Sequence, residues 1–217
     1  MHRKDLLITD SVYHIFNRGV NKAPIFFSEE DYQRFIDAAS HYLTSNHKFS
    51  YERYGLGENL PINVSKKDEP KVEILAYCLM PNHFHFVVKQ VRDNGVSDYF
   101  KRLANSYSHY VNIKYKRVGP LFQGRFKNVL VESDEQLIHL SRYVHLNPLV
   151  AGLVSNLRNY HWSSYRCYLG VDNDSLCRTD IVKGHFSSVS EYEKFVLDQA
   201  DYAKELERIK HLGVDSA

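Results

Sequence analysis

The sequence has few cysteines, no long apolar run and no large excess of charge of either sign. Its 217 residues include three cysteines, and no two of them form a C-x-x-C pair. This argues against a disulfide-stapled secreted scaffold and against cysteine-based zinc or redox chemistry. No apolar run approaches the length needed to cross a bilayer. We therefore expect a soluble, cytoplasmic protein with free thiols and no membrane partner.

The composition is that of a folded domain. Lys and Arg number 28 against 26 Asp and Glu, and 43% of the residues are hydrophobic, which excludes both a disordered tail and a histone-like polycation. The 16 tyrosines and 12 histidines supply many flat rings, on which unpaired bases can stack, although ordinary packing explains most of them. Nucleic-acid binding must therefore be sought in local basic clusters.

The hydrophobic pattern predicts seven elements in the order strand, helix, strand, strand, helix, strand, helix. Alternation over residues 11–18 is typical of an antiparallel strand, and residues 29–44 have the spacing of an amphipathic helix capped by Ser28. The others are strands at 72–79 and 83–88, a helix at 96–115, a strand at 122–132 with a bulge or close approach at Gly124, and a helix from Ser133 to Pro148. This is the ferredoxin-like α+β order, βαββαβ, with helices on one face of an antiparallel sheet, the other face available, and one added helix.

The domain organisation follows from where this pattern ends. Residues 1–150 are predicted to form one domain with a long insertion at about 54–70, preceded by a short strand at 49–53. Residues 151–217 are predicted to be a C-terminal extension with a helix around 190–210. In this extension Trp162, Tyr165 and Tyr168 are expected to pack as an appendage on the core.

Two pairs of residues could carry chemistry. His83 and His85 flank Phe84 on a predicted strand, so both imidazoles emerge on one face and could bind one divalent metal, or simply face solvent. Tyr143 and Asn147 lie one helical turn apart and could supply a nucleophilic phenol and an amide metal ligand. They could equally be a half-buried helix aromatic and a C-terminal cap. The residues alone leave both interpretations open.

Four motifs follow one another between about residues 11 and 155. They are YHIFNRG at 13–19, LMPNHFH at 79–85, GRFK at 124–127 and RYVHLNP at 142–148. Together and in this order, they resemble those of the single-tyrosine HUH transposases. More narrowly, they are similar to the REP-associated tyrosine transposases, which are linked to repetitive extragenic palindromes.

This resemblance implies a DNA strand transferase that cleaves and rejoins single-stranded or hairpin DNA through a 5′-phosphotyrosine. It implies that His83 and His85 are catalytic metal ligands, that Asn147 is the third ligand, and that Tyr143 is the nucleophile on its helix. The implied cofactor is a divalent metal, Mg²⁺ or Mn²⁺. The implied partner is single-stranded or hairpin DNA.

Basic residues near these motifs are expected to contact DNA phosphates as a group. They are Arg18, Lys101, Arg102, Lys114, Lys116, Arg117, Arg125, Lys127 and Arg142. Three matters stay open at this point. A hairpin-binding protein without turnover and a metal-dependent nuclease that uses water are alternative functions. A homodimer and a monomer both fit the sequence, as do a mobile and a domesticated element.

Overall fold

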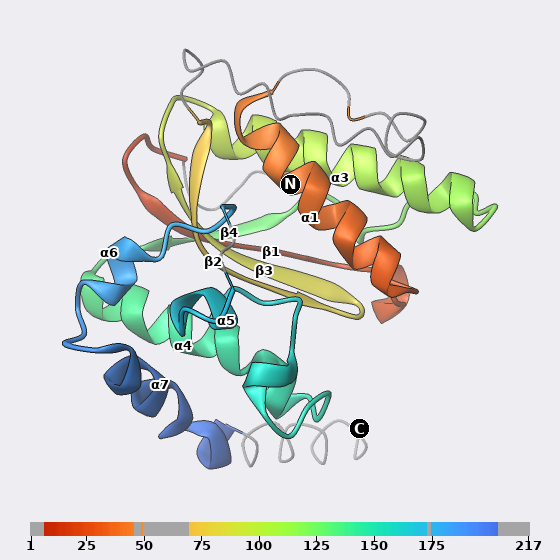
Figure 1. The fold of residues 1–217 in the computed structure, drawn as a ribbon. Helices are drawn as coiled ribbons and strands as arrows, with labels where there is room; N and C mark the ends of the chain where they lie inside the picture. The colour runs from red at the N-terminus through yellow and green to blue at the C-terminus, as the bar shows by residue number, and fades with distance from the viewer. Residues whose placement is uncertain (1–6, 46–48, 50–69, 173–174, 204–217) are drawn as a thin grey trace, which may run out of the picture.

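A four-stranded antiparallel sheet lies at the centre of the protein. The computed structural model describes residues 7–45, 49, 70–172 and 175–203. The strands are β1 (Val12–Arg18), β2 (Val72–Met80), β3 (His83–Gln90) and β4 (Lys127–Val131), in the spatial order β2-β3-β1-β4. Helix α1 (Glu29–Thr44) connects β1 to β2, and α3 (Gly95–Lys114) connects β3 to β4 (Figure 1). The predicted ferredoxin-like order is confirmed.

Helices α1 and α3 cover one face of the sheet (Figure 1). Helix α1 has the predicted bounds and begins with a capping box between Ser28 and Asp31. The two helices bury Phe35 and Phe100 against Phe84 and Phe86 of β3. Alternation along β3 therefore sends its phenylalanines into this core and its two histidines to the other face.

The other face is covered by α4 (Asp134–Val150) and by the segments that follow it (Figure 1). These segments are η2 (Leu157–Asn159), α5 (Tyr165–Tyr168), α6 (Asp180–Lys183) and α7 (Val189–Leu197); a short turn, η1 (Val20–Lys22), follows β1. Val87 of β3 packs in a second core cluster with Val144, Tyr165, Tyr168 and Tyr192. The expected appendage is thus a second core, and the face expected to be available is largely occupied.

Residues of the C-terminal extension also pair with the outer edge of β2. The backbone N–H of Leu79 donates to the Trp162 carbonyl at 2.8 Å, and the N–H of Ser164 donates to the Tyr77 carbonyl at 3.0 Å. Further along the strand, the N–H of Arg178 donates to the Ile74 carbonyl at 2.7 Å. The edge strand is therefore covered by the chain itself along much of its length.

The predicted strand at 122–132 is wrong at its beginning, because β4 starts only at Lys127. Gly124 has a φ of 144°, which favours glycine, and a Cβ there would meet nothing within 4 Å. The glycine is thus needed for its backbone angle and not for a close approach. The side-chain amide of Asn17 donates to the Gly124 carbonyl at 3.0 Å and holds the segment in a loop.

The predicted end of α4 at Pro148 is also wrong, since the helix continues to Val150. Proline lacks an N–H, but the last turn keeps the hydrogen bond from the Ala151 N–H to the Asn147 carbonyl at 2.9 Å. Pro148 and Leu149 are both buried. Burial of these two side chains offsets the lost hydrogen bond, and Ala151, not Asn147, is the cap.

The C-terminal helix is shorter than expected, because α7 ends at Leu197 and a turn at 198–199 separates it from helical residues 200–203. Residues 204–210 of the predicted helix, the strand at 50–53 and the insertion at 54–69 lie outside the described residues. None of the described helices combines the length and the apolar character needed to cross a bilayer.

Candidate active site

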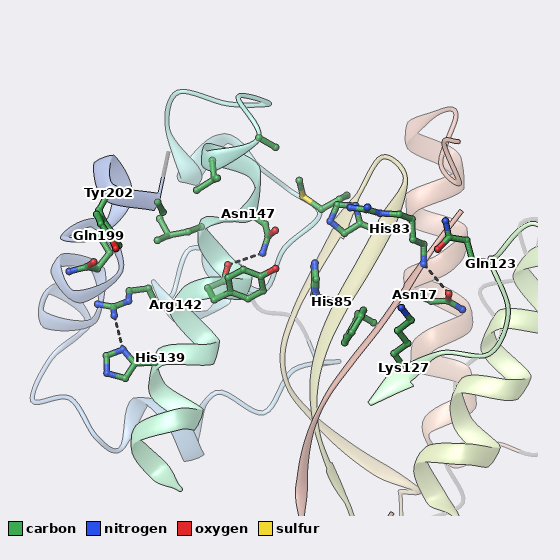
Figure 2. A pocket seen from close by; sticks show the side chains of 18 of the residues that line it. Asn17, His83, His85, Gln123, Lys127, His139, Arg142, Asn147, Gln199 and Tyr202 are labelled. Atoms are coloured by element: carbon green, nitrogen blue, oxygen red, sulfur yellow. Dashed lines mark hydrogen bonds between the residues drawn. The ribbon is translucent and has the colours of Figure 1, made fainter. Parts of the chain in front are cut away.

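A cavity of about 940 Å³ lies where the end of β1 and the start of β3 face α4 (Figure 2). It brings together residues that are far apart in the sequence. Of the predicted site residues, the following line it: Arg18, His83, His85, Arg125, Lys127, Arg142, Tyr143 and Asn147.

His83 and His85 point into this cavity from one face of β3, with ring centroids 5.0 Å apart and ring planes nearly perpendicular. Asn82 fixes the tautomer of His83. Its Nδ2 donates to the Lys22 carbonyl at 2.9 Å, so its Oδ1, 2.6 Å from Nδ1 of His83, is the acceptor. Nδ1 of His83 therefore carries the proton, and Nε2 keeps the lone pair that a metal requires.

His85 is only 7% exposed, and His14 of β1 lies against it. Nε2 of His14 is 2.9 Å from Nδ1 of His85, and the two rings meet edge to edge and nearly in one plane, with centroids 5.1 Å apart. Burial, and then the neighbouring His14, His83 and Arg18, lower the pKa of His85 well below its ordinary value. Burial lowers the pKa of His14 to about 4. Both imidazoles are therefore neutral at neutral pH.

Tyr143 projects from α4 toward the histidines. Its ring centroid is 5.5 Å from that of His85 and 6.0 Å from that of His14, and the tyrosine is 50% exposed. Asn147 lies one turn further on, and its Nδ2 donates to the Tyr143 carbonyl at 2.8 Å (Figure 2). This bond uses the amide nitrogen, so the amide oxygen Oδ1 is the atom of Asn147 that could bind a cation.

The donors at this site fit a divalent metal. Within the described part of the chain, no three His, Cys, Asp or Glu side chains form a metal-binding group. Two imidazoles and one amide oxygen nevertheless face one cavity, and such a mixed nitrogen and oxygen set suits Mn²⁺ and related divalent ions. His83, His85 and Asn147 are the residues that could hold the ion, with water or substrate oxygens completing its coordination.

The predicted basic residues separate into two groups. Arg18, Arg125, Lys127 and Arg142 line the cavity. The remainder lie on or just after α3, on the opposite side of the sheet: Lys101, Arg102, Lys114, Lys116 and Arg117. In that second group Lys114 forms ion pairs with Glu30 and Asp31, and Arg102 pairs with Asp98. The nine basic residues were expected to contact DNA as one group. In the structure they lie on two sides of the sheet and do not line one groove.

Several cavity residues were not predicted. They are Phe16, Asn17, Met80, Gln123, His139, Leu146, Val150, Ala151, Gln199, Tyr202 and Ala203. Gln199 and Tyr202 come from the C-terminal extension, whose position over α4 no local pattern indicates. His14 was also missed. The alternation of β1 places it on the same side as Phe16, but its contact with His85 depends on the pairing register of β1 and β3.

Comparison with known proteins relates this site to a family. Residues 60–147 match the family model described as IS200-like transposase. A search of curated proteins found no matching sequence. Among solved structures, the chain is similar to a REP-associated tyrosine transposase bound to a REP hairpin, with a TM-score of 0.56 and 13% identity, over 82% of this chain and 97% of that one.

A second structure, tRNA(His) guanylyltransferase from Saccharomyces cerevisiae, has a TM-score of 0.39 and 10% identity, over 88% of this chain and 73% of that one. That score is too low to carry an argument. The segment that matches the family model contains His83, His85, Tyr143 and Asn147. The family model matches less than half of the chain, so it relates residues 60–147 to the IS200-like transposases, and the solved structure shows a shared fold.

Proposed function

We propose that this protein is a transposase-like enzyme that cleaves and rejoins single-stranded or hairpin DNA with Tyr143 as its nucleophile. The observation that carries the proposal is the approach of the Tyr143 ring to within 5.5 Å of His85 in one chain, at a cavity lined by basic side chains. The similar fold of a transposase bound to a REP hairpin supports hairpin DNA as the substrate class.

The covalent step is an exchange of one phosphodiester for another. Oη of Tyr143 forms a bond to phosphorus, and the bond from phosphorus to the 3′ oxygen breaks. The product is a 5′-phosphotyrosine and a free 3′-hydroxyl, which in the overall balance takes up the phenol proton. Neither water nor ATP is consumed, so a 3′-hydroxyl can attack the phosphotyrosine and reverse the reaction.

The residues around Tyr143 have separate tasks in this proposal. A divalent ion, Mg²⁺ or Mn²⁺, would offset the negative charge that develops on the phosphoryl oxygens when it is bound. His83, His85 and Asn147 would hold it. The lowered pKa of His85 keeps its imidazole neutral, so His85 can bind without losing a proton, and the amide oxygen of Asn147 carries none. Arg18, Arg125 and Lys127 would bind the flanking phosphates.

The substrate should be a strand that can bend into the cavity. Tyr143 is held on α4 beside β3 and cannot move far toward a duplex backbone. A single strand or the unpaired flank of a hairpin can bring its phosphate to the phenol instead. We infer that DNA ends or loops next to a hairpin stem are the cleavage sites.

The test uses hairpin DNA labelled at its 3′ end, incubated with the protein and Mn²⁺. The expected product is a labelled covalent adduct that survives denaturing gel electrophoresis. Tyr143→Phe should abolish the adduct and retain hairpin binding. Tyr202→Phe, which changes the other tyrosine of the cavity, should still form it.

Three results would contradict the proposal in different ways. An adduct that persists in Tyr143→Phe would refute the choice of nucleophile. Cleavage with no protein-linked product would favour a nuclease that uses water. Tight hairpin binding with no cleavage under any divalent metal would favour a binding protein without turnover.

A further inference from the structure

We propose that His14 is a positioning residue, which accepts a hydrogen bond from Nδ1–H of His85 and so leaves Nε2 of His85 free to bind the metal. The inference rests on the proposed function, because it concerns a ligand of the proposed ion. His14 does not line the cavity itself. Its proposed effect on the metal site is exerted through His85.

Strand pairing creates this contact. In the antiparallel register of β1 and β3, Phe16 lies opposite His85, and His14 lies opposite Val87. His14 is therefore the diagonal neighbour of His85 on the same face of the sheet, a separation that rings can bridge. The ring planes of the two imidazoles differ by only 22°, and the 2.9 Å distance joins Nε2 of His14 to Nδ1 of His85, so the rings meet edge to edge as an in-plane hydrogen bond requires.

Comparison with His83 indicates which of the two nitrogens is the donor in this hydrogen bond. A metal-binding imidazole needs a lone pair on the nitrogen that faces the ion and usually donates its other N–H to a fixed acceptor. For His83 that acceptor is Oδ1 of Asn82, whose own orientation is set by the Lys22 carbonyl. For His85 the corresponding partner is His14. The two ligands thus have separate acceptors but the same tautomer.

Two replacements distinguish the effect of the acceptor nitrogen of His14 from the effect of the bulk of its ring. His14→Phe keeps a flat ring beside His85 and removes the acceptor. His14→Gln loses the ring and keeps an acceptor oxygen at about the position of Nε2. His109→Phe, on the exposed surface of α3, is the matched control for loss of a histidine.

The first measurement is the pair of imidazole ¹⁵N chemical shifts of His85 in the metal-free full chain. In the wild type we expect the pattern of the Nδ1–H tautomer. His14→Phe should shift His85 toward the Nε2–H tautomer, while His14→Gln and His109→Phe should retain the wild-type pattern. A wild-type protein with His85 in the Nε2–H form would overturn the inference without any variant.

The second measurement is the affinity for Mn²⁺ alone, by calorimetric titration. His14→Phe should weaken binding about 10- to 100-fold, the usual effect of removing the partner of a metal-binding histidine. His14→Gln should recover most of the affinity, and His109→Phe should match the wild type. Equal affinity of His14→Phe and wild type would refute the role of His14.

The two proposals can fail separately. If Mn²⁺ binding by the wild type is absent or unchanged by His83→Ala, the metal site of the proposed function fails. The tautomer of His85 in the metal-free protein then still decides whether His14 sets it. If the wild type binds Mn²⁺ through His83 and the His14 variants show no effect, only the inference about His14 fails.

Discussion

Asp31 is the buried carboxylate at which the first turn of α1 meets the last turns of α3. It has no exposed surface and accepts five hydrogen bonds of 2.8–3.0 Å. The donors are the backbone N–H groups of Phe27 and Ser28, the hydroxyls of Tyr110 and Tyr115, and the ammonium of Lys114. Lys114 is therefore committed to a structural ion pair on the face of the sheet opposite the cavity.

Replacing this carboxylate should destabilise the fold. Asp31→Asn removes the charge that compensates Lys114 and leaves donors without acceptors, which should cost about 3 kcal/mol in the free energy of unfolding at pH 7. Glu30→Gln is the control, because Glu30 pairs with the same ammonium at 2.9 Å but its side chain is 82% exposed. Its loss should cost less than about 1 kcal/mol. Urea unfolding of both variants measures the difference.

Comparison of the wild type with Asp31→Asn also tests how the stability that Asp31 contributes depends on pH. Burial raises the pKa of Asp31, but hydrogen bonds from Lys114, the Phe27 backbone, Tyr115 and Tyr110 outweigh it and leave the pKa below its ordinary value. A lowered folded pKa stabilises the protein above the ordinary aspartate pKa of about 3.9, and this contribution disappears as the pH falls through the folded value. The difference in stability between wild type and Asp31→Asn should therefore shrink below about pH 4. A difference that grows there would contradict this sign.

At the scale of single residues, part of the candidate site could be predicted from the sequence. The period of a strand puts His83 and His85 on one face, and the period of a helix puts Tyr143 and Asn147 on one face, as the structure has them. His14 could not be predicted, because strand register is a tertiary property. The roles of all these residues remain predictions until the experiments above are done.

At the scale of elements, His145 connects α4 to two other segments. Its Nδ1 is 2.7 Å from Oη of Tyr192 on α7, and its Nε2 is 2.8 Å from Oγ of Ser164. Oγ of Ser164 in turn accepts the backbone N–H of Tyr77 on β2 at 2.9 Å. The helix that carries Tyr143 is thus linked on its buried side to the sheet and to the C-terminal extension.

This buried histidine should make the docking of α4 sensitive to acid. Burial lowers the pKa of His145 to about 3, so unfolding takes up a proton between that value and the ordinary pKa of about 6.5. The contribution of neutral His145 to the free energy of unfolding is complete above about pH 6.5. It is lost as the pH falls toward the pKa of His145 in the folded protein. His145→Gln should reduce the pH dependence of the unfolding free energy by about 1.4 kcal/mol per pH unit between roughly pH 4 and 6.

Urea unfolding at several pH values in this window measures that slope. His14 and His85 also have lowered pKa values and will keep part of the slope in the variant. His139→Gln is the matched control for loss of a histidine from the same helix, because the His139 side chain is 50% exposed. An equal slope in wild type and His145→Gln would show that protonation of His145 does not govern stability there.

The elements that were predicted well have local causes, and those that were not depend on distant contacts. The bounds of α1 follow from its capping box and its apolar spacing, both visible in the sequence. The start of β4 depends on Asn17, which binds the Gly124 carbonyl across more than a hundred residues. The end of α4 depends on burial of Pro148 and of Leu149, which belongs to the second core. Local propensity does not report such contacts.

At the scale of the whole molecule, the boundary at residue 150 separates two parts that share one core. Val87 and Val144 come from before it, and Tyr165, Tyr168 and Tyr192 come from after it, yet all belong to one buried cluster. Residues 162–164 and 178 also occupy the outer edge of β2. We propose that residues 1–150 do not form an independent domain.

A chain truncated after Val150 should therefore fail to fold cooperatively. Truncation would expose the apolar face of the sheet and the unpaired edge of β2, both of which favour aggregation. Solubility, near-ultraviolet circular dichroism and thermal unfolding of the truncated and full chains measure the effect. A fragment that unfolds cooperatively and still binds hairpin DNA would restore the two-part division that the sequence indicated.

The arrangement of one chain also predicts that Tyr143 acts together with the histidines of its own chain. Tyr143 already lies beside His85 of the same chain, and β2 offers its outer edge to the extension instead of to a second sheet. A mixture of Tyr143→Phe with a His83→Ala/His85→Ala variant should therefore form no covalent adduct with hairpin DNA. Suppose instead that two chains exchanged their α4 helices. In each dimer that contains one chain of each variant, one of the two sites would then combine an intact tyrosine with intact histidines, and adduct would appear. A mixture of wild type with Tyr143→Phe is the control, and its adduct should scale with the amount of wild type alone.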